Sequence, residues 1–322
     1  MGHMRRNHNH IFIRLFAGVL GLSIAASCTW CRSDAKNHSN VDTTLLRDSI
    51  SKIVSTYPGE IGVAVIVDNT DTVTVNNRNI YPMMSVFKLH QSLAVCHDFD
   101  RRGTGLDSLI SIDRSDLDQH TWSPMLKEHP EEEITLSVAE LMRYALIQSD
   151  NNASNLMFKR LVNVAQTDSF IATVVPRRDF RIVYTEEEMS ADHSRAYTNS
   201  TSPLGAAILI NRIFTDSIVS QDKQSFIAGA LSECRTGTDR IVAPLLGRPG
   251  ITAAHKTGSG YRNERGILAA HNDVAYISLP DGISYSLAVF VKDFNGDEAQ
   301  AAAAIARVSD AVYYILSLTD KQ

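Results

Sequence analysis

A serine and a lysine three residues apart, Ser85 and Lys88, are the residues in this sequence whose types and spacing best suit covalent chemistry. Positions three apart share one face of a helix, so the Lys88 ammonium can reach the Ser85 hydroxyl. A serine hydroxyl needs a neighbouring base or a proton-accepting network before it attacks a carbonyl. A helix start also offers free backbone N–H groups to a developing oxyanion. Ser85 is therefore a candidate nucleophile.

The Ser-x-x-Lys spacing is not specific by itself, because it occurs four times in the chain. The four pairs are Ser33/Lys36, Ser49/Lys52, Ser85/Lys88 and Ser220/Lys223. Any one of them could be a solvated pair on a helix surface. Only further motifs can choose among them.

Three further groups follow Ser85 in the chain, and each lies on a suitable element. They are Ser149-Asp150-Asn151 in a polar turn between two expected helices, Glu186 in a long polar segment, and Lys256-Thr257-Gly258 at the end of an expected strand. Each group is weak evidence alone. Their order and placement favour the Ser85/Lys88 pair over the other three.

The elements that must position these groups are strands at both ends of the chain and helices between them. Apolar and β-branched runs predict strands at 62–67, 72–75, 252–257, 266–279 and 284–292, and apolar stripes predict helices at 43–57 and 299–318. Residues 107–232 are predicted to be largely helical. The pattern indicates an α+β fold, an α/β sandwich in which a five-stranded antiparallel sheet is built from both termini with terminal helices, plus an inserted all-α lobe. We expect the site between the two lobes.

The chain divides into a targeting segment, a linker and one domain. Arginines precede a short apolar run in 1–31, which is typical of a signal peptide and short for a membrane span of about 20 residues. We therefore expect export to the periplasm, with Cys28 a candidate for lipidation and residues 1–4 a tag remnant or an early start. Residues 32–41 form the linker. The domain spans 42–322, with a sheet lobe at 42–80 and 250–322 and a helical lobe at 81–249.

Composition excludes several classes of protein. The formal net charge is −5, which argues against the basic face of a nucleic-acid binder. No grouping of His, Cys, Asp and Glu has zinc-ligand spacing, so neither a metal nor another cofactor is expected. Cys96 and Cys234 could form one disulfide or remain two separate thiols, and separate thiols are favoured. We expect a monomer without a protein partner.

Together these motifs resemble the class A serine β-lactamases, within the wider family that includes the penicillin-binding proteins. The similarity runs from about residue 42 to the end of the chain. It implies that Ser85 is the nucleophile and that Lys88 is its proton-handling neighbour. It also implies that Ser149 passes a proton to the leaving lactam nitrogen and that Asn151 holds the acylamide side chain of the substrate.

The same resemblance assigns roles to the Lys-Thr-Gly group. Lys256 and Thr257 would bind the substrate carboxylate, and Gly258 would allow the backbone to approach the substrate closely. The backbone N–H groups of Ser85 and Ser259 would donate to the oxyanion.

Glu186 matches the deacylating carboxylate of the family. The family pattern is Glu-x-x-[Leu/Met]-x, and Glu186-Glu187-Glu188-Met189-Ser190 fits it about thirty-five residues after Asn151. Two alternatives stay open: the acidic run is merely solvated, or Glu187 is the matching residue. Ser190 stands where the family commonly has an Asn that helps to hold the deacylating water.

Two short segments resemble the PER-type extended-spectrum cephalosporinase branch. They are Thr-Glu-Glu-Glu-Met at 185–189 and Cys-Arg-Thr-Gly at 234–237. Arg240, which follows the second segment, is a candidate for binding the substrate carboxylate, and its alternative is an ordinary surface arginine. Met84 precedes Ser85 where some carbapenemase branches have Cys.

The resemblance predicts an enzyme that opens the β-lactam ring of penicillins and cephalosporins through a serine acyl-enzyme and so gives antibiotic resistance. The first alternative is a penicillin-binding protein or DD-carboxypeptidase that acts on peptidoglycan peptides, and Glu186 argues against it. The second is a β-lactam sensor domain that stays acylated; such domains usually follow transmembrane helices.

Overall fold

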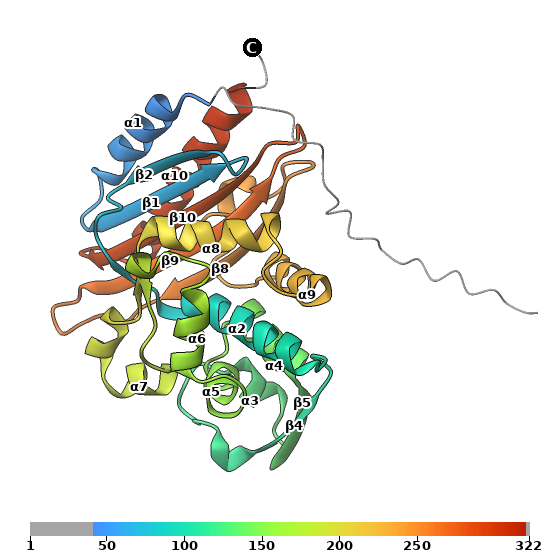
Figure 1. Cartoon of the computed structure of the whole chain (residues 1–322). Helices are drawn as coiled ribbons and strands as arrows, with labels where there is room; N and C mark the ends of the chain where they lie inside the picture. Colours follow the sequence, from blue (N-terminus) through green and yellow to red (C-terminus); the bar gives the residue numbers. More distant parts are fainter. Residues whose placement is uncertain (1–40, 320–322) are drawn as a thin grey trace, which may run out of the picture. The chain divides into compact units, whose positions relative to one another are not determined.

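The computed structural model of the protein describes residues 41–319, and its centre is an antiparallel five-stranded sheet (Figure 1). The strands are β1 (Glu60–Val67), β2 (Asp71–Val75), β8 (Thr252–Ser259), β9 (Leu268–Ser278) and β10 (Ser284–Phe294), in the order β2-β1-β10-β9-β8. Pairing of β1 with β10, with Val63 opposite Val289, joins the two ends of the domain. The predicted α+β fold, with one sheet built from both termini, is confirmed.

The terminal helices α1 (Thr43–Val54) and α10 (Glu298–Thr319) cover one face of this sheet. Leu46 and Ile50 of α1 are fully buried in the same apolar core as Ile305 of α10. By length and composition α10 could cross a membrane, but half of its apolar window is buried within the structure, as in the core helix of a globular domain.

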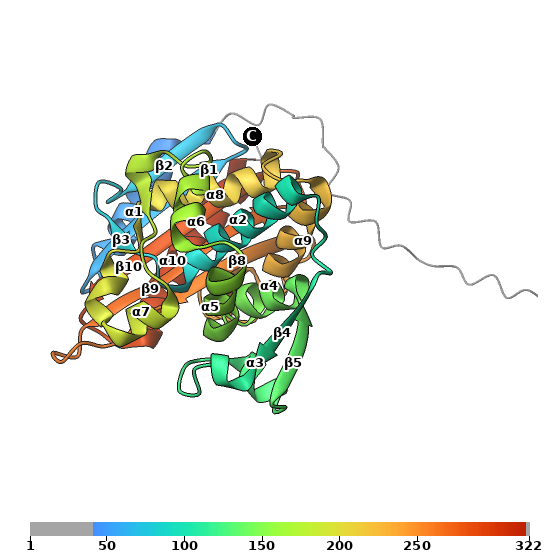
Figure 2. The same cartoon turned by 60° about the horizontal axis from the view of Figure 1, so that its bottom comes forward.

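The other face of the sheet carries most of the remaining helices. There α8 (Pro203–Thr215) crosses β1 and β10, and α2 (Phe87–Arg102) lies among further helices (Figures 1 and 2). These are α4 (Val138–Ile147), α5 (Asn151–Arg160), α6 (Val164–Ile171) and α9 (Gln221–Ser232). The proposed lobe boundaries assign α8 to the helical lobe, whereas its apolar residues pack on the sheet.

Residues 107–232 are largely helical as predicted, but a β-hairpin among them shows that the inserted lobe is not all-α. Strands β4 (Leu109–Asp113) and β5 (Glu133–Ser137) pair antiparallel, with the short helix α3 (Pro124–Glu128) between them (Figure 2). Ile112 and Ile134 face each other and are buried, while polar residues alternate with them. This period of two is the strand signal that the helical prediction overlooked.

The long polar segment 183–203 is more ordered than its composition suggests. It contains helix α7 (Glu186–Ala191) and β7 (Ser200–Thr201), and β7 joins β3 (Tyr81–Pro82) and β6 (Phe180–Arg181) in a small sheet. The Asn199 amide accepts from the N–H groups of Val183 and Tyr184 at 2.8 and 2.9 Å. The Asn199 carbonyl in turn accepts from the Met83 N–H at 2.8 Å. The segment is thereby fixed to the backbone just before Ser85.

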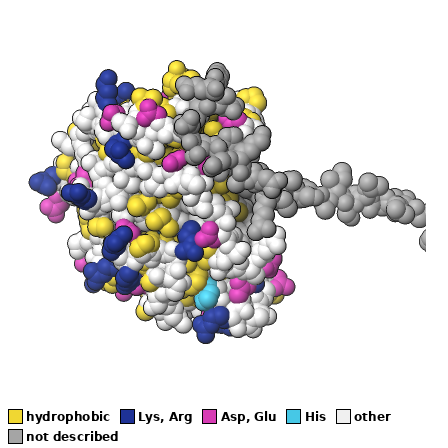
Figure 3. All heavy atoms as spheres, turned by 45° about the horizontal axis from the view of Figure 1, so that its top comes forward, with side chains coloured by type: hydrophobic (Ala, Val, Ile, Leu, Met, Phe, Trp, Pro, Cys, Tyr) yellow, Lys and Arg dark blue, Asp and Glu magenta, His cyan; other side chains and the backbone are white. Residues whose placement is uncertain are grey.

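Charged side chains of both signs are mixed on the surface. Figure 3 shows Lys and Arg interspersed with Asp and Glu on the face it presents. This distribution agrees with the small net charge of −5.

Of the remaining sequence predictions, the structure describes the two cysteines of the domain but not the N-terminal segment. The predicted signal peptide and Cys28 lie outside the described residues. Cys96 and Cys234 are free thiols, so the alternative with two separate thiols is confirmed.

The turn 149–151 is held by a buried carboxylate at the start of α5. Asp150 is the N-cap residue, and its carboxylate accepts from the N–H of Ala153 at 2.9 Å and from the N–H of Met125 at 2.8 Å. The Ser123 hydroxyl donates to the same carboxylate at 2.9 Å. Asp150 therefore fixes the chain between the two polar residues, Ser149 and Asn151, that flank it.

Replacement of this cap should destabilise the fold. Asp150→Ala leaves the buried N–H groups of Ala153 and Met125 without an acceptor, and we expect it to lower the free energy of unfolding by about 2–4 kcal/mol in denaturant titrations. Ser137→Ala, which removes the exposed capping box of α4, is the matched control and should cost about 1 kcal/mol. If both variants lost the same free energy of unfolding, burial of the Asp150 cap would not add to its stabilising effect.

Candidate active site

Ser85 and Lys88 meet where a 3-10 turn (Met84–Val86) leads into α2. The Lys88 Nζ donates to the Ser85 Oγ at 2.9 Å. Met84 has a φ of +47°, in the left-handed region that residues other than glycine rarely adopt. Such strain persists only where the surroundings enforce it, and it is typical of functional sites.

Four oxygen atoms surround the fully buried Lys88 Nζ. Besides the Ser85 Oγ, these are the Asn151 Oδ1 at 2.6 Å, the Ser149 carbonyl oxygen at 2.8 Å and the Glu186 Oε1 at 2.8 Å. The last of these contacts is an ion pair. All four partners are acceptors, as suits an ammonium group.

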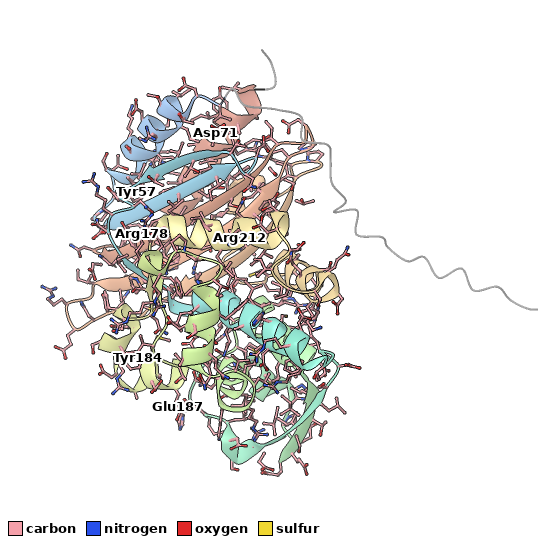
Figure 4. All side chains as sticks on the ribbon, viewed as in Figure 1. Tyr57, Asp71, Arg178, Tyr184, Glu187 and Arg212 are labelled. Atoms are coloured by element: carbon pink, nitrogen blue, oxygen red, sulfur yellow. The ribbon has the colours of Figure 1, made fainter. Side chains whose placement is uncertain are left out.

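Glu186 lies at the first position of α7, with its carboxylate directed at the nucleophile. The Ser85 hydroxyl donates to the Glu186 Oε1 at 3.1 Å. Glu187 is exposed, and its backbone N–H donates to the Asn155 side chain at 3.2 Å. Figure 4 labels Glu187 and Tyr184, which flank Glu186 on this segment. The structure thus brings Glu186, rather than the alternative Glu187, to Ser85, while Ser190 is exposed.

Lys256 approaches the same centre from β8. Its Nζ donates to the Ser149 Oγ at 3.0 Å and to the Thr257 carbonyl at 2.9 Å. Burial, together with the positive charge of Lys88, lowers the pKa of Lys256 to about 7. Lys256 can therefore gain or lose a proton near neutral pH, and Ser149 is in contact with it.

The rest of the Lys-Thr-Gly group lies close to the backbone that carries the nucleophile. A Cβ atom on Gly258 would be 2.4 Å from the Met83 carbonyl oxygen, so no other residue fits without a shift of the backbone. Glycine is thus required here by the segment before Ser85, in addition to the approach of a substrate that the sequence suggested. The Thr257 hydroxyl forms a 2.6 Å hydrogen bond with the hydroxyl of Thr236.

Arg240 is buried and contacts the end of β8, so it is not an ordinary surface arginine. Its Nη2 donates to the Ser259 Oγ at 2.6 Å, and its Nη1 donates to the Asn272 carbonyl at 2.7 Å. Within residues 41–319 its Nε has no hydrogen-bond partner. The guanidinium therefore places a positive charge beside Ser259.

Three residues of the site were not predicted from the sequence. Thr236 contacts Thr257, and the Thr121 hydroxyl accepts from the Asn151 Nδ2 at 2.9 Å. The Asn272 Nδ2 donates to the Pro82 and Met83 carbonyls at 2.8 and 3.2 Å. Thr236 lies in the Cys-Arg-Thr-Gly segment noted in the sequence, and Asn272 is the middle one of three consecutive polar residues in β9, whereas Thr121 had no such signal. No group of three or more His, Cys, Asp and Glu side chains that could hold a metal occurs in the described part of the chain.

Comparison with known proteins identifies the family. The model of the beta-lactamase enzyme family matches residues 45–316. The chain is 58% identical over 317 residues to a beta-lactamase of Phocaeicola vulgatus, with 98% of this chain and 99% of that protein covered. It is 32% identical over 297 residues to the extended-spectrum beta-lactamase PER-1 of Pseudomonas aeruginosa, with 92% and 95% covered.

Solved structures agree with these sequence matches. A class A beta-lactamase of Bacteroides cellulosilyticus superposes with a TM-score of 0.81 at 30% identity, covering 86% of this chain and 98% of that one. The resemblance stated from the motifs, including that to the PER-type branch, is confirmed. The chain belongs to the class A β-lactamase family.

Proposed function

We propose that this protein hydrolyses the β-lactam ring of penicillins and cephalosporins through an acyl-enzyme on Ser85, and so gives antibiotic resistance. The observation that carries the proposal is the position of the Ser85 Oγ, 2.9 Å from the Lys88 Nζ and 3.1 Å from the Glu186 Oε1. The relative named as an extended-spectrum beta-lactamase supports cephalosporins among the substrates.

In the acylation step the Ser85 Oγ attacks the lactam carbonyl carbon and its proton passes to the Glu186 carboxylate. Lys88 remains hydrogen-bonded to both groups and stabilises the negative charge that moves between them. The backbone N–H groups of Ser85 and Ser259 donate to the oxyanion, and Gly258 lets β8 lie close enough for this arrangement.

The ring opens when the carbon–nitrogen bond breaks and the nitrogen takes a proton from the Ser149 hydroxyl. Lys256 can replace that proton, because its Nζ donates to the Ser149 Oγ at 3.0 Å. Lys256, Thr257 and Arg240 would bind the substrate carboxylate, and Asn151 would hold the acylamide group. The substrate carboxylate supplies a negative charge beside Lys256, whose hydrogen bonds go to neutral oxygens.

The deacylation step separates a β-lactamase from the alternatives. Once Glu186 has released its proton to solvent and Lys256 has regained one from solvent, Glu186 would take a proton from a water molecule that attacks the Ser85 ester, and the ester then breaks with return of the proton to Ser85. A penicillin-binding protein or a sensor domain needs no such carboxylate, since it releases the acyl group slowly. The ion pair of Glu186 with Lys88 at 2.8 Å therefore favours turnover.

The remaining proposals concern the state of the protein in the cell. We propose that residues 1–31 direct export to the periplasm, with lipidation of Cys28 as a further step, and that the enzyme acts as a monomer. The arginines and apolar run of the N-terminal sequence support export. Residues 42–322 would then form the mature catalytic domain.

Two substitutions separate acylation from deacylation. Ser85→Ala should give no covalent adduct with a cephalosporin by intact mass. Glu186→Gln should accumulate the acyl-enzyme and hydrolyse at least about 100-fold more slowly, because Lys88, no longer paired with a carboxylate and 2.9 Å from the Ser85 Oγ, can still accept the serine proton in acylation, whereas the base that activates water in deacylation is lost. Absorbance of the opened ring measures the rate.

The matched control is Glu187→Gln, which removes an exposed carboxylate from the neighbouring position. Its hydrolysis rate should stay within about twofold of the unmodified protein, as expected for a surface substitution. Normal turnover by Glu186→Gln, or accumulation of the adduct in Glu187→Gln instead, would exclude our assignment of the base.

The lowered pKa of Lys256 predicts a pH dependence for anionic substrates. As the pH rises through about 7, Lys256 in the free enzyme loses its proton and its charge. We therefore expect kcat/KM for a cephalosporin to fall on the alkaline side, mainly through a rise in KM. The measurement is kcat and KM between about pH 5 and 9, a span that brackets this pKa.

Lys256→Arg provides the comparison, because an arginine stays charged across this range. Its KM should vary less with pH than that of the unmodified enzyme, even if its kcat is lower. If kcat/KM of Lys256→Arg fell at high pH as steeply as that of the unmodified enzyme, a group other than Lys256 would be responsible for the pH dependence.

A further inference from the structure

A half-buried thiol, Cys234, lies beside the substrate-binding strand and has no part in the mechanism above. It follows α9, and its Sγ is 3.4 Å from the Thr236 Oγ1 and 3.7 Å from the Thr236 carbonyl oxygen. Thr236 is the residue whose hydroxyl bonds to Thr257 at 2.6 Å. Thr236 thus connects Cys234 to the Lys-Thr-Gly group.

A buried ion pair faces this thiol. The His255 Nδ1 is 3.0 Å from the Asp273 Oδ1, and both side chains are almost fully buried. The Asp273 Oδ2 also accepts from the Ile241 N–H at 3.1 Å, which fixes the carboxylate. Burial opposes protonation of His255, but the charge of Asp273 and its hydrogen bond outweigh burial and raise the pKa of His255 to about 10. The ring is therefore a cation at neutral pH.

His255 also lies close enough to Cys234 to stabilise the charge of its thiolate. Burial of the thiol opposes its ionisation, yet its interaction with the charged His255 and the positive charge of Lys256 lower the pKa of Cys234 to about 7. Thiolates in electropositive, partly exposed surroundings are the reactive ones. Asp273 therefore holds the positive charge on His255, and that charge in turn stabilises the Cys234 thiolate.

We propose that Cys234, His255 and Asp273 form a reactive-thiol site at which small organic disulfides convert Cys234 to a mixed disulfide. The Cys234 thiolate attacks one sulfur of the disulfide, a new S–S bond forms and the original S–S bond breaks. The second half leaves as a thiolate and takes a proton from solvent. Cys234 is oxidised and the small disulfide is reduced, so the exchange needs no further oxidant.

The modification would reach the active site by two routes, and this part of the inference rests on the proposed function. A substituent on the Cys234 Sγ would displace Thr236, which contacts it, and so weaken the bond from Thr236 to Thr257. Loss of the thiolate charge would also remove one of the groups that hold the pKa of Lys256 up. Both changes weaken capture of an anionic substrate, so KM should rise more than kcat falls.

Cys96 provides a control within the same molecule. It is fully buried in α2, and burial raises its pKa to about 12. With the thiolate fraction and its nucleophilicity both considered, Cys234 should exchange on the order of 100-fold faster than Cys96 at pH 7.

The test uses the full chain and 2-hydroxyethyl disulfide, a neutral probe. Remaining thiols are alkylated in denaturant at intervals, and peptide mapping by mass spectrometry gives the rates for Cys234 and Cys96 separately. The expected result is selective modification of Cys234, with a rate that rises with pH around a midpoint near 7. Equal rates for the two thiols, or an inert Cys234, would overturn the proposal.

Variants separate the parts of the site. Asp273→Asn keeps the shape of the carboxylate and removes its charge, so the midpoint should move upward; an unchanged midpoint would exclude the role of the ion pair. If this variant does not fold, the midpoint of the unmodified protein decides alone, because an ordinary thiol titrates near about 8.5.

The effect on catalysis is measured on the modified protein with an anionic cephalosporin. KM should rise several-fold and return when dithiothreitol removes the substituent, while Cys234→Ser should not respond to the disulfide. A mixed disulfide that leaves KM unchanged would refute the link to the substrate-binding strand. The mass measurement does not depend on β-lactam turnover, so failure of the proposed function would be seen separately.

Discussion

The arrangement of the active site depends on one buried ammonium group, that of Lys88. A fully buried cation is costly unless its charge is paired and its donors are bonded. The four acceptors come from three segments that are distant in sequence: the turn at Ser85, the turn at Ser149 and Asn151, and the start of α7 at Glu186. Each segment is also held by other contacts: the backbone before Ser85 by the Asn272 side chain, the turn at 149–151 by the Asp150 cap, and the chain before Glu186 by Asn199. The site is therefore assembled before any substrate arrives.

Local chemistry made much of this predictable from the sequence. The Ser137 and Glu140 side chains form a capping box at the start of α4, a pattern that local sequence encodes, and the apolar and β-branched runs located all five strands of the main sheet. The order of the motifs selected Ser85/Lys88 from four equivalent spacings. Lys223 also approaches Ser220, at 3.4 Å, but its charge is paired with Asp100, so spacing alone would not have distinguished the two pairs.

What the sequence did not reveal depends on tertiary packing. The hairpin of β4 and β5 alternates apolar and polar residues over only five positions per strand, too short a run to outweigh a helical neighbourhood. The choice between Glu186 and Glu187 follows from the direction in which α7 enters, which no local pattern encodes. Thr236 and Asn272 act through contacts with residues far along the chain, so their importance appears only when the sheet is formed.

The charge of Lys256 is less well compensated than that of Lys88. The Lys256 amine is fully buried, yet no carboxylate among residues 41–319 forms an ion pair with it. Its hydrogen bonds go to neutral oxygens, and the nearby charge of Lys88 is repulsive, so its pKa lies near 7 rather than at the usual value for lysine. An anionic ligand that enters beside Lys256 would supply the missing charge, and by linkage it would raise the pKa of the group that binds it. The amine thus lowers the stability of the free protein and raises its affinity for a substrate carboxylate. Such a loss of stability in favour of binding is expected at a functional site.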